Sequence, residues 1–129
     1  MRGVRALSLT AAAALVSSAC GGRVCRDQLL DLKESPDHRY NAALLVRNCE
    51  GEPVVTHVNI HNGYGGPPAE ADGRATRGEV FTVEGERKVV LTWKGARSLQ
   101  IECVGCEGNK VSRKDAAWED VQITYAARD

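Results

Sequence analysis

Short stretches in which apolar and polar residues alternate run through most of the chain and predict β-strands. The clearest is residues 54–61. Four of its residues share one face of the predicted strand: Val54, Thr56, Val58 and Ile60. His57, Asn59 and His61 fall on the opposite face, because successive side chains of a strand point to opposite sides. We therefore expect the first set to face a core and the second to form an outward polar face.

Five further segments show the same period, and turns rich in Gly, Pro or Asp separate them. They cover residues 40–47, 79–84, 88–94, 99–104 and 121–125. Residues 28–34 fit one or two helical turns or a short strand, and residues 114–118 fit one helical turn. Together the pattern predicts an all-β fold, a small and mainly antiparallel curved sheet or sandwich of about six strands, with room for one short helix.

Residues 62–78 interrupt the pattern with several glycines, two prolines and no apolar period. Such a stretch predicts a long mobile loop. Tyr64 lies in its Gly-rich first part and is a candidate contact for a partner. His57 and His61, on the predicted outward face, are candidate contacts as well.

The N-terminal residues have the three-part pattern of a secretory signal. Arg2 and Arg5 form a basic start, residues 6–16 are mostly apolar, and the small residues 17–19 precede Cys20. The apolar stretch is shorter than the ~20 residues that a membrane-spanning helix needs. It therefore indicates export.

The chain has 129 residues, which is enough for one domain. We predict a signal peptide at 1–19, a tether at 20–24 and a single β-rich globular domain at 25–129 with the mobile loop at 62–78. A hydrophobic content of 43% and a charged content of 26% are typical of a globular protein. Seventeen basic residues balance seventeen acidic ones, so binding of nucleic acid through bulk positive charge is not expected.

Four cysteines remain after Cys20, and four cysteines can pair in three ways. Their spacing favours a Cys25–Cys49 bridge and a Cys103–Cys106 bridge across a tight turn. An extracytoplasmic setting allows both. The Cys-x-x-Cys spacing of Cys103 and Cys106 also leaves open a thiol redox pair or a metal site. Since no second ligand pair at zinc spacing accompanies them, we predict no metal.

The residues before Cys20 resemble the lipobox of bacterial lipoproteins, with Ser18 and Ala19 in the small-residue positions. This resemblance implies that Cys20 becomes the N-terminus, carries lipid and anchors the domain to a membrane of the bacterial envelope. Without lipidation, the same signal implies a periplasmic or secreted protein.

The order of motifs is similar to that of a group of short uncharacterised bacterial envelope proteins that contain a domain of unknown function. The matching positions are Cys25, 35–37, Cys49, 56–60, 89–93, 99–101 and 121–125. The resemblance spans most of the chain that follows the signal. It implies a Cys25–Cys49 bridge and no assigned activity.

The sequence contains no Gly-x-Ser-x-Gly motif and no carboxylate spacing that identifies an acid–base pair. We therefore predict no catalytic residues and no cofactor. Our first hypothesis is a non-enzymatic, lipid-anchored envelope domain that supports or binds another envelope protein. Two alternatives stay open: a thiol redox protein that uses Cys103 and Cys106, and an inhibitor or ligand-binding module that uses the 62–78 loop.

Overall fold

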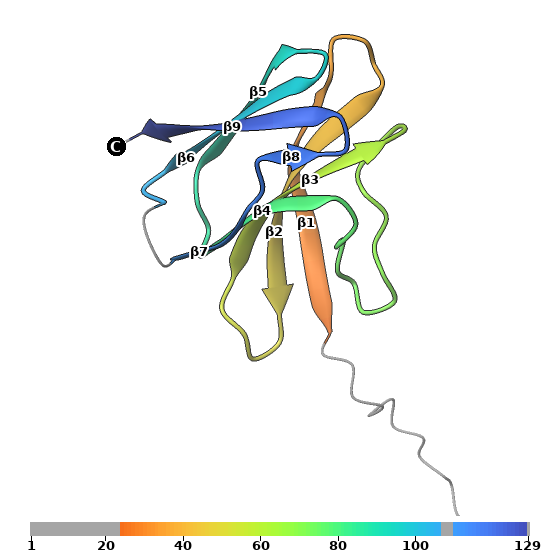
Figure 1. Cartoon of the computed structure of the whole chain (residues 1–129). Coiled ribbons are helices and arrows are strands. Elements are labelled where there is room, and N and C mark those ends of the chain that lie inside the picture. Colours follow the sequence, from red (N-terminus) through yellow and green to blue (C-terminus); the bar gives the residue numbers. More distant parts are fainter. Residues whose placement is uncertain (1–23, 107–109, 129) are drawn as a thin grey trace, which may run out of the picture.

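The computed structural model describes residues 24–106 and 110–128, which form two β-sheets packed face to face (Figure 1). The predicted signal peptide and the predicted lipid attachment at Cys20 lie outside the described residues. Among the described residues, no helical segment has the length and hydrophobicity that crossing a membrane requires.

Nine strands make up the two sheets in this part of the chain. In chain order they are β1 (Cys25–Glu34), β2 (Tyr40–Cys49), β3 (Val55–Asn62), β4 (Glu79–Glu84), β5 (Val89–Gly95), β6 (Ser98–Val104), β7 (Val111–Lys114), β8 (Ala117–Trp118) and β9 (Val121–Arg128). The first sheet has the order β1-β2-β3-β4-β7, and the second has the order β5-β6-β9-β8. Neighbouring strands are antiparallel except β6 and β9, which are parallel. The predicted all-β fold is confirmed.

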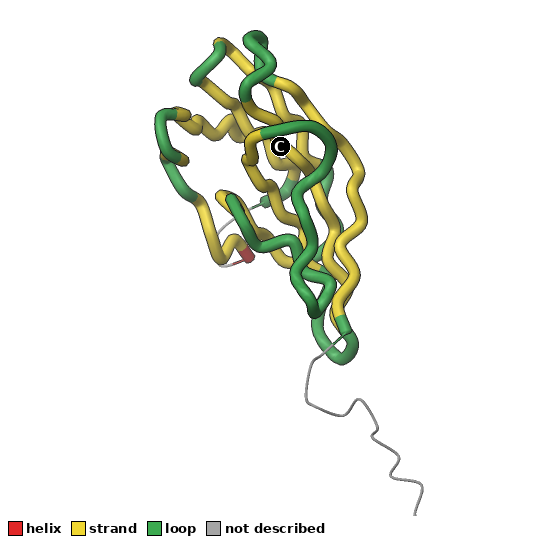
Figure 2. The backbone as a smooth tube through the Cα atoms, turned by 90° about the vertical axis from the view of Figure 1, so that its right-hand side faces the viewer, coloured by secondary structure: helices red, strands yellow, loops and turns green. Residues whose placement is uncertain are grey.

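The core lies between the sheets and is mostly aliphatic. Val58 and Ile60 of β3 and Phe81 of β4 belong to the same buried cluster as Leu99 and Ile101 of β6. β2, β3, β5 and β6 contribute alternate residues, because only one side of a pleated strand faces the other sheet. Figure 2 shows loops at both ends of the molecule and a further long loop that runs along the strands.

The six predicted strands are all present, and three more join them. Residues 28–34, which the pattern left ambiguous, belong to the ten-residue strand β1, because β1 pairs with β2 over its whole length. The predicted helical turn at 114–118 is wrong: Lys114 ends β7, and Ala117–Trp118 forms β8. These short strands have little apolar period of their own and are defined by their partners β4 and β9.

Both cysteine pairs that the spacing favours lie at disulfide distance. Cys25 and Cys49 are direct cross-strand partners at the start of β1 and the end of β2, with Cα atoms 4.0 Å apart. Cys103 and Cys106 join the end of β6 to the turn after it, with Cα atoms 5.5 Å apart. In the chain-entropy model, closing the longer loop stabilises the fold by about 3 kcal/mol.

Candidate functional site

The outer face of the first sheet is covered by the 62–78 loop. The prediction that His57, Asn59 and His61 lie opposite the core residues of β3 is confirmed. The expectation that this face is exposed to solvent is wrong, because His57 and Asn59 are fully buried and His61 is 6% exposed. In this conformation neither histidine therefore offers a surface for the predicted contact with a partner.

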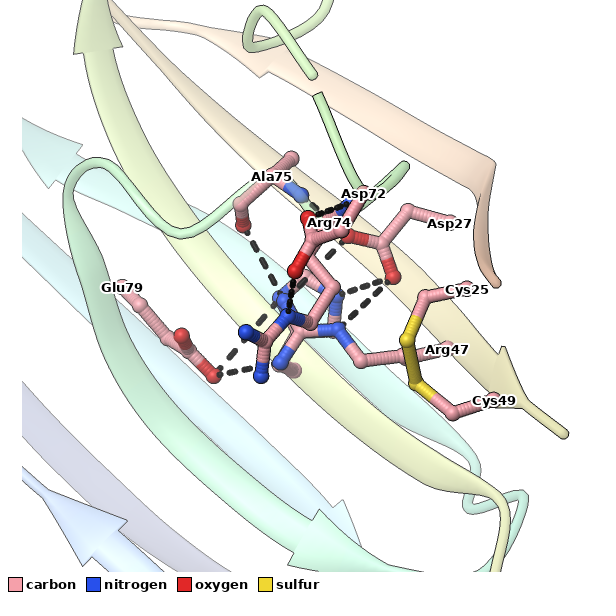
Figure 3. The surroundings of a disulfide bond; sticks show 9 residues. Cys25, Asp27, Arg47, Cys49, Asp72, Arg74, Ala75 and Glu79 are labelled. Carbon is pink, nitrogen blue, oxygen red and sulfur yellow. Dashed lines mark hydrogen bonds and ion pairs between the residues drawn. A yellow bond between two sulfur atoms is a disulfide. The ribbon is translucent and has the colours of Figure 1, made fainter. Parts of the chain in front are cut away.

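A buried carboxylate, Asp27 of β1, organises the polar groups under the loop. Its Oδ1 atom accepts hydrogen bonds from Arg47 Nε and from His57 Nε2, both at 3.1 Å. Its Oδ2 atom accepts from Arg47 Nη2 at 3.2 Å and from the backbone N–H of Ala75. The Asp27 side chain is only 3% exposed. Figure 3 shows Asp27, Arg47 and Ala75 beside the Cys25–Cys49 bridge.

Asn59 connects the same network to the loop on its other side. Its Nδ2 group donates to the carbonyls of Ala75, at 2.7 Å, and of Arg77, at 3.1 Å. These two bonds fix the orientation of the side-chain amide. Its Oδ1 atom then lies 2.7 Å from His57 Nδ1. Both ring nitrogens of His57 therefore lie at hydrogen-bond distance from side-chain oxygens, one of Asn59 and one of Asp27.

A second carboxylate also faces the cluster. Glu79 of β4 lies 3.6 Å from Arg47 Nη1 and 4.0 Å from His57 Nδ1, so two carboxylates lie beside one guanidinium and one imidazole. Buried charges are tolerated only when paired and hydrogen-bonded. Burial by itself raises the pKa of Asp27, but the hydrogen bonds from His57, Arg47 and Ala75 outweigh it and lower this pKa to about 2.

The polar side chains of the cluster are bonded to one another and to the loop. Both nitrogens of His57 are bonded to Asn59 and Asp27, so neither is free to activate a nucleophile. Within residues 24–106 and 110–128, no group of three or more His, Cys, Asp or Glu side chains is arranged to hold a metal ion. The arrangement therefore acts by holding the loop, through both backbone groups of Ala75.

Residues 63–78 of this loop contain no regular strand or helix, and hydrogen bonds join the loop to the sheet. The Cys25 N–H donates to the Asp72 carbonyl at 3.0 Å, and the Ile60 N–H donates to the Gly78 carbonyl at 2.8 Å. The loop lies so close to the sheet that a Cβ atom at Gly73 or Gly78 would sit 1.9 Å from a backbone oxygen. Only glycine permits this approach.

Two buried side chains hold the part of the loop around Tyr64. Asn41 Nδ2 donates to the Gly63 carbonyl, and His61 Nε2 donates to the Gly65 carbonyl at 2.6 Å. The backbone on each side of Tyr64 is therefore fixed, and its side chain is 97% exposed. Two residues predicted from the sequence therefore lie near each other. His61 bonds to the loop backbone from below, and the Tyr64 side chain projects into solvent.

Two exposed leucines lie next to each other on β1, and one of them, Leu29, lies close to this part of the loop. Leu29 and Leu30 of β1 are each 44% exposed. A bulge between Leu29 and Asp31 breaks the strand alternation, so two consecutive leucines are both accessible. An added Cβ at Gly66 would lie 3.2 Å from Leu29 Cδ2, so the loop passes directly over this leucine. We call Leu29, Leu30 and Tyr64 the apolar edge.

Sequence reasoning missed Asp27, Arg47 and Glu79, although one signal was available. If Cys25 and Cys49 pair across antiparallel strands, Asp27 and Arg47 must face each other two residues further along, as they do. The other candidate pair remains apart from this site: Cys103 is a buried residue of β6, and Cys106 lies in the turn.

Comparison of the chain with models of protein families, with curated proteins and with solved structures finds no significant match. The geometry of the chain itself therefore carries the functional argument.

Replacing Asp27 with Asn should destabilise the domain strongly. The substitution keeps the shape but removes the charge that pairs with Arg47 and His57, and breaking a buried pair costs about 3–5 kcal/mol. Urea denaturation followed by tryptophan fluorescence measures the free energy of unfolding. Glu86→Gln is the control, because Glu86 is exposed, and its effect should stay within about 0.5 kcal/mol. Equal effects of the two substitutions would contradict a structural role for the cluster.

The contribution of Asp27 should also disappear in acid. Its pKa is about 2 in the folded chain against an ordinary value of 3.8, so its stabilisation is complete above pH 5 and is lost as the pH falls towards 2. This shift corresponds to stabilisation on the order of 2 kcal/mol. The difference in unfolding free energy between the wild type and Asp27→Asn should therefore narrow by about 2 kcal/mol between pH 5 and pH 2. A difference that stays constant over this range would show that the Asp27 carboxylate is not the group responsible.

Proposed function

We propose that this chain is a non-enzymatic, extracytoplasmic binding domain that presents the apolar edge to a partner protein of the cell envelope. The observation that carries the proposal is Tyr64, which is 97% exposed although buried side chains hold the backbone on both sides of it. This proposal joins the hypothesis of a binding domain to that of a module acting through the 62–78 loop.

A fixed loop with an exposed aromatic residue suits protein recognition. Tyrosine supplies a large contact area at low cost in side-chain entropy and is enriched among the residues that dominate binding energies. A loop already held in one conformation loses little further entropy on binding. The two exposed leucines of β1 extend the contact area beside the loop.

The N-terminal pattern and the two cysteine pairs support an extracytoplasmic location. Disulfides persist in oxidising compartments, and residues 1–20 carry the signal and lipobox-like pattern. In the proposed topology, the lipid is attached at Cys20, five residues before Cys25 at the start of β1. His61 of β3 pairs with Asn41 of β2, and Asn41 pairs with Glu34 at the last position of β1. The loop backbone that is bonded to His61, beside Tyr64, therefore lies at the end of β1 opposite Cys25.

A photo-crosslinking amino acid at position 64 should trap one discrete partner in cells that express the full chain at its natural level. Tyr64 projects fully into solvent, so the replacement leaves the fold intact. Mass spectrometry of the adduct identifies the partner. The matched control places the same group at Thr124, an exposed residue of β9 on the second sheet. The proposal fails if position 64 gives no adduct or the same set of adducts as position 124.

The mature chain extracted from membranes should begin at Cys20, carry lipid and contain two disulfides. Intact-mass measurement before and after reduction reports all three features, since each bridge adds two hydrogens when it is reduced. A Cys20→Ser variant is the control and should lose the lipid mass and leave the membrane fraction. A wild-type mass without lipid would leave the secreted or periplasmic alternative in place of the anchored one.

A further inference from the structure

The second sheet ends in a strand whose outer side is not paired with any other described strand. This strand is separate from the apolar edge formed by Leu29, Leu30 and Tyr64. β5 is the outermost strand of the order β5-β6-β9-β8. Its register with β6 is unbroken from Val89 to Trp93. Just before Val89, the Val104 N–H donates to the Lys88 carbonyl at 3.0 Å, so Lys88 and Val104 form a hydrogen-bonded pair. Bonded pairs alternate along an antiparallel ladder. The N–H and C=O groups of Val89, Leu91 and Trp93 therefore point to the open edge.

A groove of about 560 Å³ runs along this edge. One wall is residues 89–93 of β5, and the other is formed by Asp31, Lys33 and Glu34 of β1 and by Pro36. Trp93 Nε1 donates to the Lys33 carbonyl at 2.8 Å and ties the two walls together. The groove thus lies where the outermost strands of the two sheets approach each other.

The two strands that border the groove differ in how they are protected from pairing. β1 has the bulge between Leu29 and Asp31 and carries charged side chains along the groove, both of which discourage the addition of another strand. Residues 89–93 of β5 contain no bulge, no proline and no charged residue. β5 is therefore the strand whose edge can accept a partner.

Charge indicates which partner fits. Lys88 and Lys94 flank residues 89–93 of β5 and are exposed, and Lys94 lies at the register shift between Trp93 and Gly95. On the opposite wall, Asp31 pairs with Lys33 at 3.9 Å and Glu34 pairs with His38 at 2.8 Å. A second copy of β5, placed antiparallel, would set lysine against lysine, which is unfavourable between directly opposed strands.

We propose that β5 binds an extended segment of a partner protein as an added strand. The segment carries acidic residues six positions apart, opposite Lys88 and Lys94, and apolar residues at the alternate positions that face the groove. Backbone hydrogen bonds with Val89, Leu91 and Trp93 provide affinity, and the alternating side chains provide specificity.

The test is an NMR titration of the purified full chain with the peptide Glu-Val-Thr-Val-Thr-Val-Glu. The shifts should saturate and be centred on β5. Amide exchange should slow at Val89, Leu91 and Trp93 but change little at Val90 and Thr92, whose N–H groups already bond to β6. A peptide with lysine at both ends should bind about tenfold more weakly at low salt, because both end pairs become repulsive.

Charge reversal on the protein provides the matched control. In a Lys88→Glu/Lys94→Glu variant, the lysine-ended peptide should become the tighter ligand. Both lysines are exposed, so the fold should not change. Tyr64→Ala should leave peptide binding unaltered, which separates this proposal from the one concerning the apolar edge.

Several outcomes would overturn the proposal. They are the absence of saturable shifts, shifts centred on the 62–78 loop, equal slowing of exchange at all five β5 amides, or an unchanged peptide preference in the reversed variant. Self-association of the wild type through β5, measured by sedimentation, would replace the partner segment with a second copy.

Discussion

The rest of the outer layer depends on the pairing of Asp27 with Arg47. A carboxylate that is 3% exposed is stable only if donors surround it, and here the donors come from β2, β3 and the 62–78 loop. The Ala75 N–H is one of these donors, so satisfying Asp27 also fixes where the loop crosses the sheet. The need of the Asp27 carboxylate for hydrogen-bond donors therefore helps to determine the path of the 62–78 loop.

This coupling gives the domain a third layer over a two-sheet sandwich. The aliphatic core between the sheets holds β3 through Val58 and Ile60, while the opposite side of the same strand is packed under the loop. His57 bonds to Asp27, and Asn59 bonds to the Ala75 carbonyl of the loop. His61 bonds to the backbone beside Tyr64. One strand therefore links the core to the exposed residue that we propose contacts a partner.

Sequence patterns predicted the strands with strong alternation and missed those without it. β3 was recognisable because polar and apolar residues alternate along it. β7 and β8 are short and are defined by pairing with β4 and β9, which lie elsewhere in the chain. The candidate site was predicted in part: Tyr64, His57 and His61 were named, but the histidines support the loop from below. Asp27 was missed because its partner Ala75 lies 48 positions away.

The sequence by itself determined the two faces of β3, the favoured cysteine pairing and the all-β class, because these depend on local period and spacing. Only the tertiary structure decided that the polar face of β3 is buried, that Leu29 and Leu30 are exposed together and that β5 has an open edge. Alternation separates two sides of a strand, but it does not specify what covers either side. That depends on contacts between distant segments, whose cost in chain entropy only the complete fold offsets.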